Sequence, residues 1–513
     1  MAEGKHPKGA RRLFRLCAQL ALGSSVWGYN IGILSSVLVH SGWRAALGNP
    51  SPAQTGLVTG AYYLGALLAY LCVAHPLADA LGRRSAAGAG TAALSAGALA
   101  MASAGSLGAM MSGRVMCGLG AGVVSTTVPL YQSEMAPAKE RGKYVTINHI
   151  GFVAGLATGL WAGYLITFWK GDAGEYWGWR VLILMQLLPA LAFAAMLPLM
   201  PETPRWLLQS GDADSASKVL HWLREDVHEP SAVAHELDAI NADIQLHHRQ
   251  ASSSFPAKTL ALFRRPALFA RLWRAFLLQF MASMCGAAAM KYYLPTLLRA
   301  LGLGTRPALM AGAVEATTKI GMGVVEMWLI DRVGRKTCLA GGSVIMAVAM
   351  LVNGVLPQLF PKNVSRVADT VCIAFIFLYA FGFSLGLGPT AWLYSSEIFP
   401  TTYRARGLNF AASGGSIGSI IVAQIWPVGV AKFGSGVYLF FFAVNAICVP
   451  VIWLLYPETK GCALEDMDAL FGKETRADGM GLRGLQDQDE EREPQDGDSA
   501  DSEAGEAQPL LSG

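Results

Sequence analysis

Several ionisable side chains lie inside long apolar segments of this sequence, where a charge is costly and usually serves function. Chief among them are His149, Lys291, Glu315 and Lys319. A lysine ammonium offers a carboxylate three donors and a full charge, and histidine titrates near neutral pH. Glu315 precedes Lys319 by four residues, the favourable order for a helical ion pair. Two interpretations stay open: the pair neutralises itself, or Lys319, His149 or both bind an acidic or strongly polar solute, with Lys291 as a third candidate.

The surrounding chain has the composition of a helical membrane protein. Of its 513 residues 53% are hydrophobic and 15% are charged, and the mean hydropathy is +0.38. Soluble domains carry about 25% charged residues, so neither a soluble enzyme nor a nucleic-acid-binding protein is expected. The sequence has no Walker A motif, no metal-ligand spacing and no nucleophile–base arrangement. We therefore predict no enzymatic activity, no cofactor, no metal and no nucleic-acid partner; the predicted partners are a small-molecule substrate and the lipid bilayer.

Apolar runs of about 20 residues, enough to cross a bilayer, predict twelve spans. Their expected limits are 13–39, 53–75, 86–106, 108–132, 142–168, 178–200, 269–297, 304–330, 337–357, 369–396, 405–431 and 434–456. Six spans precede a long polar segment and six follow it, which predicts an all-α membrane protein with twelve transmembrane helices in two six-helix bundles. The expected domains are a cytoplasmic N-terminus (1–12), an N-terminal bundle (13–200), a cytoplasmic loop with short helices (201–268), a C-terminal bundle (269–457) and an acidic, largely disordered cytoplasmic tail (458–513).

Charges between the spans predict the orientation of the chain. Lys and Arg are denser at the N-terminus and after the even-numbered spans, which places both termini and the central loop in the cytoplasm. The net charge of +4 divides into −9 from residue 474 onwards and +13 before it. Asn363, in an outer loop, fits the N-glycosylation tripeptide, and Glu506–Leu511 resembles an acidic dileucine signal for a sorting adaptor. We expect the plasma membrane, with a vacuolar or endosomal membrane as the alternative.

Three short motifs occur twice, once in each half of the chain. They contribute acidic and basic residues at the predicted cytoplasmic ends of spans: Asp79, Arg83, Glu134, Arg141 and Glu202 in the first half, and Asp331, Arg335, Glu397, Arg404 and Glu458 in the second. Parallel repeats of six helices are typical of secondary transporters. We expect these residues to pair between helices and to act as a gate that breaks when the protein opens inward. The alternative is surface pairing added to the positive-inside pattern.

Together with Arg114-x-x-x-Gly118-x-Gly120, Trp179-Arg180 and Gly388-Pro-x-x-Trp392, these motifs resemble the sugar porter family of the major facilitator superfamily. The resemblance covers nearly all of 13–462. It implies two bundles around a central cavity that opens alternately to each side, and transport of a sugar or related small polar solute. Two other functions stay open, a nutrient sensor with the same fold and an exporter of a secondary metabolite.

The resemblance also predicts which residues contact the substrate, and there this sequence departs from the family. The amides typical of the seventh span fall on Ala282, Ser283 and Ala288, whereas the fifth-span glutamine falls on His149 and the eighth-span asparagine on Lys319. The predicted substrate-binding residues are Asn30, Asn148, His149, Gln279, Ser283, Tyr292, Tyr293, Lys319 and Trp392. Because cations and small residues replace neutral amides, a sugar acid or polyhydroxy-carboxylate is predicted on an equal footing with a hexose or polyol.

Asn30 bears on energy coupling. The resemblance places it where proton-coupled sugar porters carry Asp and glucose facilitators carry Asn. An amide does not exchange a proton near neutral pH, which predicts a uniporter. Proton coupling stays open as well, because His149 and Glu315 are titratable groups at membrane depth.

Overall fold

The computed structural model describes residues 8–137, 141–225, 230–249, 260, 262–360 and 365–460. Every regular element in these ranges is helical. The predicted glycosylation site Asn363, the dileucine-like Glu506–Leu511 and the side chains of Arg141 and Asp331 lie outside the described residues.

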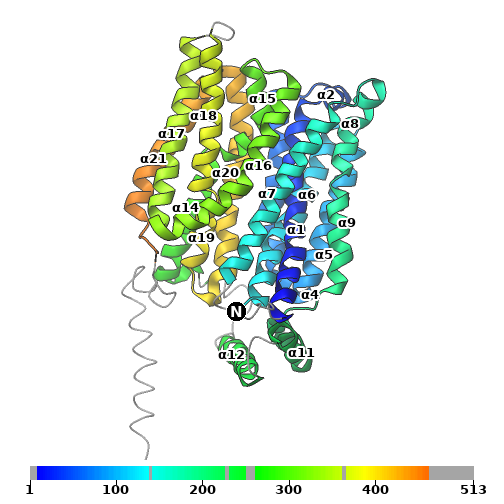
Figure 1. Ribbon diagram of the computed structural model, residues 1–513, viewed down its shortest axis with the longest axis vertical. Helices are drawn as coiled ribbons and strands as arrows, with labels where there is room; N and C mark the ends of the chain where they lie inside the picture. Colours follow the sequence, from blue (N-terminus) through cyan, green and yellow to red (C-terminus); the bar gives the residue numbers. More distant parts are fainter. Residues whose placement is uncertain are drawn as a thin grey trace, which may run out of the picture.

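Helices of the two halves form two bundles that stand side by side (Figure 1). The first bundle contains α1 (Lys8–Val39), α3 (Pro52–Leu68) continued by η1 (Ala69–Val73) and α4 (Ala74–Leu81), α5 (Arg83–Ala102), α6 (Leu107–Met135), α7 (Arg141–Ile166), and α8 (Asp172–Leu184) continued by α9 (Leu187–Met196) and η3 (Leu197–Leu199). The second contains α14 (Pro266–Met284) continued by α15 (Ala287–Ala300), α16 (Thr305–Val333), α17 (Arg335–Leu359), α18 (Arg366–Leu385) continued by α19 (Pro389–Glu397), α20 (Thr401–Phe433) and α21 (Gly436–Leu455).

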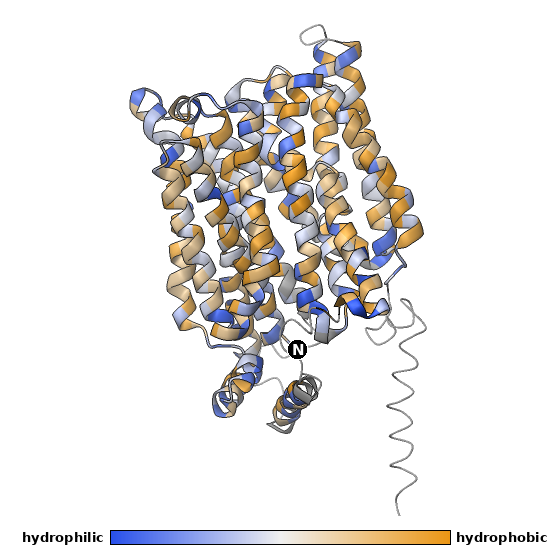
Figure 2. Ribbon diagram, turned by 180° about the vertical axis from the view of Figure 1, so that it is seen from behind, coloured by the Kyte–Doolittle hydropathy of each residue, from blue (hydrophilic) through white to orange (hydrophobic). Residues whose placement is uncertain are grey.

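Among the described residues, eleven helical segments are long and apolar enough to cross a membrane. Apolar residues run along the bundle helices, and hydrophilic residues gather at their ends and on the short helices below them (Figure 2). The expected eighth span, α16, has 29 residues and the length to cross. It is more polar than the others because Glu315, Lys319 and Glu326 lie within it.

Several spans are broken in the middle, and side chains from other helices satisfy the exposed backbone. Gly286 separates α14 from α15 with a φ of 106°, a left-handed conformation that favours glycine. The adjacent carbonyl of Cys285 accepts hydrogen bonds from the Tyr379 hydroxyl at 3.1 Å and the Asn445 amide at 2.9 Å. Gly388 and Pro389 likewise separate α18 from α19. Such breaks are tolerated at membrane depth where neighbouring helices replace the lost backbone partners.

The two bundles meet along three helix pairs. α3 packs along α20, α7 along α16, and α1 against α15. Side-chain hydrogen bonds cross this interface at different depths: Tyr293 donates to Thr59 Oγ1 at 3.0 Å, and Trp161 Nε1 donates to Thr317 Oγ1 at 3.0 Å. A solute site between the bundles would therefore be lined by α1, α3 and α7 on one side and by α15, α16 and α20 on the other.

Short helices follow the first bundle at the end of the molecule that holds the N-terminus (Figure 1). They are α10 (Pro204–Gln209), α11 (Ala213–Arg224) and α12 (Pro230–Arg249), whereas α2 (Ser41–Ala46) lies near the opposite end. Arg224 at the end of α11 makes two hydrogen bonds to Glu236 of α12, at 2.9 and 3.1 Å, and donates to the Met135 carbonyl of α6 at 3.2 Å. This buried guanidinium attaches the short helices to the bundle, at the end that the charge pattern predicts to be cytoplasmic.

Candidate functional site

The ionisable residues His149, Lys291, Glu315 and Lys319 come together at the interface of the bundles. Glu315 and Lys319 form an ion pair on α16, with side chains 8% and 14% exposed. Lys291 of α15 lies within electrostatic range of both, and His149 of α7 lies within range of Lys291. With a neutral imidazole, two ammonium groups and one carboxylate give this cluster a net charge of +1.

Lys291 is the source of the surplus charge. Its ammonium group lies 5.5 Å from the centroid of the Phe383 ring, a cation–π distance. Among the described residues, no carboxylate lies within 4.0 Å of this ammonium group. Because Glu315 already neutralises Lys319, Lys291 carries a charge that a solute can neutralise.

The wall of α1 and α7 opposite Lys291 is aromatic and polar. The His149 ring lies 6.1 Å from Phe152, which stacks on Trp27 with the centroids 4.0 Å apart. Asn148 accepts a hydrogen bond from Ser24. His149 makes no hydrogen bond within the described part of the chain and is partly exposed, so its imidazole can donate to or accept from a bound hydroxyl group.

The remaining residues predicted to contact substrate in the second bundle fall into different environments. Ser283 accepts a hydrogen bond from Ser419 at 3.2 Å. Gln279 is buried one turn earlier on α14, and its Nε2 atom has no partner among the described residues. Tyr293 is buried and donates across the interface to Thr59. Trp392 on α19 is 44% exposed. Gln279 and Tyr293 are thus buried in this conformation, and Trp392 is the most exposed of these four residues.

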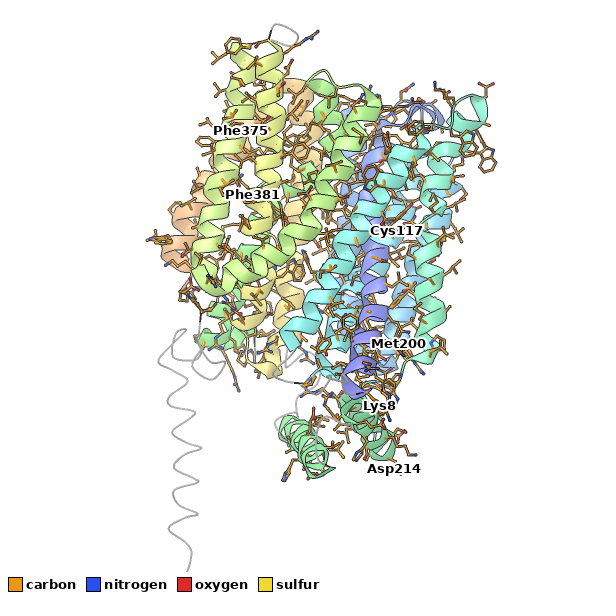
Figure 3. The ribbon with its side chains drawn as sticks, in the orientation of Figure 1. Lys8, Cys117, Met200, Asp214, Phe375 and Phe381 are labelled. Carbon is orange, nitrogen blue, oxygen red and sulfur yellow. The ribbon has the colours of Figure 1, made fainter. Side chains whose placement is uncertain are left out.

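Asn30 belongs to a buried network and is not exposed to a solute in this conformation. It accepts a hydrogen bond from the Arg114 guanidinium at 2.9 Å and donates to Gln186 Oε1 at 2.7 Å. Arg114, one turn before the labelled Cys117 in Figure 3, lies 4.8 Å from the centroid of the Tyr62 ring. Tyr292 closes the same cluster, with its ring centroid 5.9 Å from the guanidinium carbon. Sequence reasoning identified Asn30 and Tyr292 but missed Arg114 and Gln186 as their neighbours, although both are polar residues inside predicted spans.

The duplicated motifs of the first half form one compact network. Arg83 Nη2 bonds Glu134 Oε1 at 2.9 Å, and the Arg83 backbone N–H bonds Glu202 Oε1 at 3.0 Å. Thr203 closes the network through its hydroxyl, which donates to Glu134 Oε2 at 2.6 Å. Burial raises the pKa of Glu202, and N–H groups of Thr203, Arg84 and Arg83 oppose that rise. Met200, which Figure 3 labels, marks this level of the bundle, since its carbonyl accepts from Arg84 at 3.1 Å.

The second half repeats this network atom for atom. Arg335 Nη2 bonds Glu397 Oε1 at 3.0 Å, and the Arg335 backbone N–H bonds Glu458 Oε1 at 2.8 Å. Thr459 donates to Glu397 Oε2 at 2.9 Å, as Thr203 does to Glu134. The sequence repeat is therefore a structural repeat, and the two threonine hydroxyls are functional groups that the sequence reasoning did not single out.

Each network also depends on a glycine. Gly82 has a φ of 88° and Gly334 a φ of 102°. A Cβ atom on Gly82 would lie 2.5 Å from Glu202 Oε2, and one on Gly334 would lie 2.7 Å from Glu458 Oε2. The glycines let the turn approach the carboxylate closely, so that two consecutive backbone N–H groups bond it.

Each network joins helices of one bundle, as the expected pairing between helices allows, and the contacts between the bundles are made by other groups. Across the interface, Asp79 of α4 and Arg406 of α20 lie within electrostatic range of each other. Thr126 of α6 also donates to Asn409 of α20 at 3.3 Å. Arg404 lies two residues before Arg406 in the sequence, and its guanidinium donates to the Phe399 carbonyl at 3.4 Å. The contacts between the bundles at this end thus include Asp79 with Arg406 and Thr126 with Asn409.

One buried acid in the second bundle escaped sequence reasoning. Glu326 of α16 is 1% exposed, and the Thr390 hydroxyl at the start of α19 donates to its carboxyl group at 3.3 Å. The signal was present, since Glu326 is an ionisable residue inside the span expected at 304–330.

Comparison with known proteins agrees with this architecture. The family described as "Sugar (and other) transporter" matches residues 16–471. The MFS-type transporter oryC of Aspergillus oryzae is 27% identical over 473 residues, which cover 89% of this chain and 85% of that protein. The quinate permease of Neurospora terricola is 30% identical over 375 residues, which cover 71% of this chain and 69% of that permease. The inward open xylose transporter XylE from E. coli has a TM-score of 0.74 at 20% identity, covering 90% of this chain and 100% of that chain. The predicted fold of twelve helices in two six-helix bundles is confirmed.

Proposed function

The chain belongs to the sugar and other transporter family, membrane carriers of the major facilitator superfamily, and on this premise we propose that it carries a small polyhydroxylated monocarboxylate by alternating access. The substrate class is a sugar acid or cyclic polyhydroxy-carboxylate. The multi-pass chain would work in the plasma membrane.

The observation that carries this proposal is the surplus cation at the bundle interface. Glu315 and Lys319 neutralise one another, and Lys291 adds a positive charge that no carboxylate in the described residues pairs with. A monoanion at 4 Å from such a charge gains about 1 kcal/mol at the dielectric constant of water and about 4 kcal/mol at an effective value of 20. A neutral hexose gains none of this energy, so the site discriminates by charge.

The rest of the cluster suits the hydroxyl groups of such a solute. His149 presents an imidazole without a hydrogen-bond partner in the described residues, and Asn148 lies beside it. Ala282 and Ala288 leave the seventh span without the amides that sugar porters use for neutral sugars. Several relatives are named quinate permeases, and quinate is a cyclic polyhydroxy-carboxylate, which supports this substrate class.

In alternating access, each cytoplasmic network would keep the helix ends of its own bundle in fixed positions relative to one another. Each network ties the helix ends of one bundle together, so the bundles can rotate as units. The contacts of α4 and α6 with α20, through Asp79–Arg406 and Thr126–Asn409, would then separate when the protein opens inward. The gate proposed here lies at this boundary, and the duplicated networks support it from either side.

Uptake into proteoliposomes tests this proposal. The panel contains neutral hexoses, polyols and sugar acids, at two pH values, with protein-free liposomes to measure passive entry. We expect sugar acids to enter fastest and hexoses to compete weakly. Faster uptake of hexoses would overturn the substrate class. Saturable binding without any flux would favour the sensor, and flux only out of vesicles in which the protein has its cellular orientation would favour the exporter.

A further inference from the structure

Glu326 is a buried carboxyl group that the proposed substrate site does not use. It lies in the half of α16 nearer the predicted cytoplasmic end, two turns beyond Lys319, and is 1% exposed. The Thr390 hydroxyl donates to it at 3.3 Å. Among the described residues, no Lys, Arg or His lies within 4.0 Å of this carboxyl group.

Among the described residues, few groups around Glu326 would stabilise a carboxylate. From α17 the titratable group facing it is the Cys338 thiol. From α19 the polar group is Thr390. The charged and titratable groups of α15 and α7, Lys291 and His149, gather around Glu315 and Lys319 instead.

A carboxylate sealed in such a place would be paired with a cation or would take up a proton, because an isolated buried charge is prohibitively costly. Since no cation of the described residues lies within 4.0 Å of Glu326, we expect its carboxyl group to be neutral in this conformation.

The partner of Glu326 lies on a short helix that follows a break in its span. α19 begins at Pro389, directly after Gly388, where the span that starts as α18 is broken. Thr390 is the second residue of α19, and Trp392, two residues further, projects from the opposite side of the helix and is 44% exposed. A solute that contacts Trp392 therefore acts on the same helical turn that covers Glu326.

We propose that Glu326 binds a proton that crosses the membrane together with the substrate, an inference that rests on the proposed transport function. In the sealed state the carboxyl group is protonated and packed against α19. When α19 moves away from α16, water reaches the group, which loses its proton to that water and becomes a carboxylate. On the return, the carboxylate takes a proton from water on the opposite side, so each cycle makes and breaks one O–H bond and moves one proton.

Proton transfer at Glu326 determines the net charge that each transport cycle moves across the membrane, and this charge can be measured. One proton and one monoanion together carry no net charge, so a pH gradient drives uptake while the membrane potential does not. A neutral substrate carried with the same proton would make uptake sensitive to the potential. The two dependences therefore separate a failure of the substrate proposal from a failure at Glu326.

The test compares wild-type protein with Glu326→Gln in proteoliposomes, using the panel solute that wild-type protein exchanges fastest. The amide keeps the shape and the contact to Thr390 but holds no exchangeable proton at neutral pH. Asp369→Asn, at the start of α18, is the matched control for a lost carboxyl group. Two quantities are measured, exchange at equal pH and net accumulation under a gradient of about one pH unit, which sustains at most about tenfold accumulation per proton.

We expect wild-type protein and Asp369→Asn to accumulate solute and to make the medium alkaline. Glu326→Gln should keep its exchange rate within about threefold but lose accumulation and proton movement. Accumulation by Glu326→Gln at the wild-type level would overturn the proposal, as would wild-type uptake that ignores the pH gradient.

Thr390→Val provides a second route if Glu326→Gln does not fold. Valine removes the hydroxyl donor that favours the carboxylate, so the midpoint of net uptake against pH should rise by about one pH unit, with exchange unaffected. An unshifted midpoint would contradict the role of Glu326, since a purely structural contact would leave the pH profile in place.

Discussion

Replacing Lys291 by methionine removes its ammonium group but keeps an unbranched side chain of similar length. The site then changes from a net charge of +1 to neutrality with little change in volume. Glu315 and Lys319 remain paired, so the substitution leaves no buried charge without a partner. Lys291→Met therefore separates the contribution of charge from that of shape.

The expected size of the effect follows from the position of the ammonium group. At a separation of 4 Å, the attraction of a monoanion is worth about 1 kcal/mol in water and about 4 kcal/mol at an effective dielectric constant of 20. Lys291 is partly exposed between the bundles, which places the site between these limits. A loss of about 2 kcal/mol corresponds to about 30-fold weaker binding of the anion. A neutral polyol loses at most one hydrogen bond, which predicts a change within about threefold.

The assay measures binding of gluconate and glucitol to the purified protein, because these solutes differ only by a carboxylate in place of a hydroxymethyl group. Lys336→Met, at the start of α17 and over the Trp453 ring, is the matched lysine control. An equal loss of affinity for both solutes would refute the electrostatic reasoning, and so would no loss for either.

Three further variants test other parts of the account. Lys319→Asn should shift preference from acids toward neutral sugars and lower thermal stability by about 3 kcal/mol, because Glu315 is left buried without its cation; an unchanged preference would mean that the pair only neutralises itself. Arg404→Ala should slow initial transport rates in vesicles while the protein still inserts, and unchanged rates would contradict a gating role. Gly82→Ala should cost about 1–3 kcal/mol of stability in thermal melting, because its Cβ would lie 2.5 Å from Glu202 Oε2 at a φ of 88°. Gly48→Ala, also at positive φ but with nothing within 4 Å, is its control and should lose less.

The fold was accessible from the sequence because its determinants are local. Runs of apolar residues predict each span, and the duplicated motifs predict two equivalent halves. Even the polar α16 was placed correctly, since Glu315 and Lys319 interrupt an otherwise apolar stretch without ending the helix. The pairing of these two residues also follows from their spacing on one helix.

The partners of buried polar groups were less accessible, because they come from helices far apart in the sequence. The motif residues Arg83 and Glu134 were expected to pair between helices, and the structure shows that the helices they join belong to one bundle. Only the three-dimensional packing reveals this, since either arrangement satisfies the same charges. Asn30 likewise fits both a solute contact and a partner for Arg114 until its neighbours are known.

Glu326 differs from these cases, because its residue type and place in an expected span already mark it as unusual. What the sequence lacks is the contact with Thr390, which depends on the break before α19. The contact between α16 and the start of α19 gives this buried acid its hydrogen-bond donor.

The central claim is that the surplus charge of Lys291 selects an anionic substrate. The most direct measurement is the ratio of the half-saturation concentrations for glucitol and gluconate, both taken on reconstituted wild-type protein at one pH. The account predicts half-saturation by gluconate at about 30-fold lower concentration. Equal concentrations, or a preference for glucitol, would contradict it.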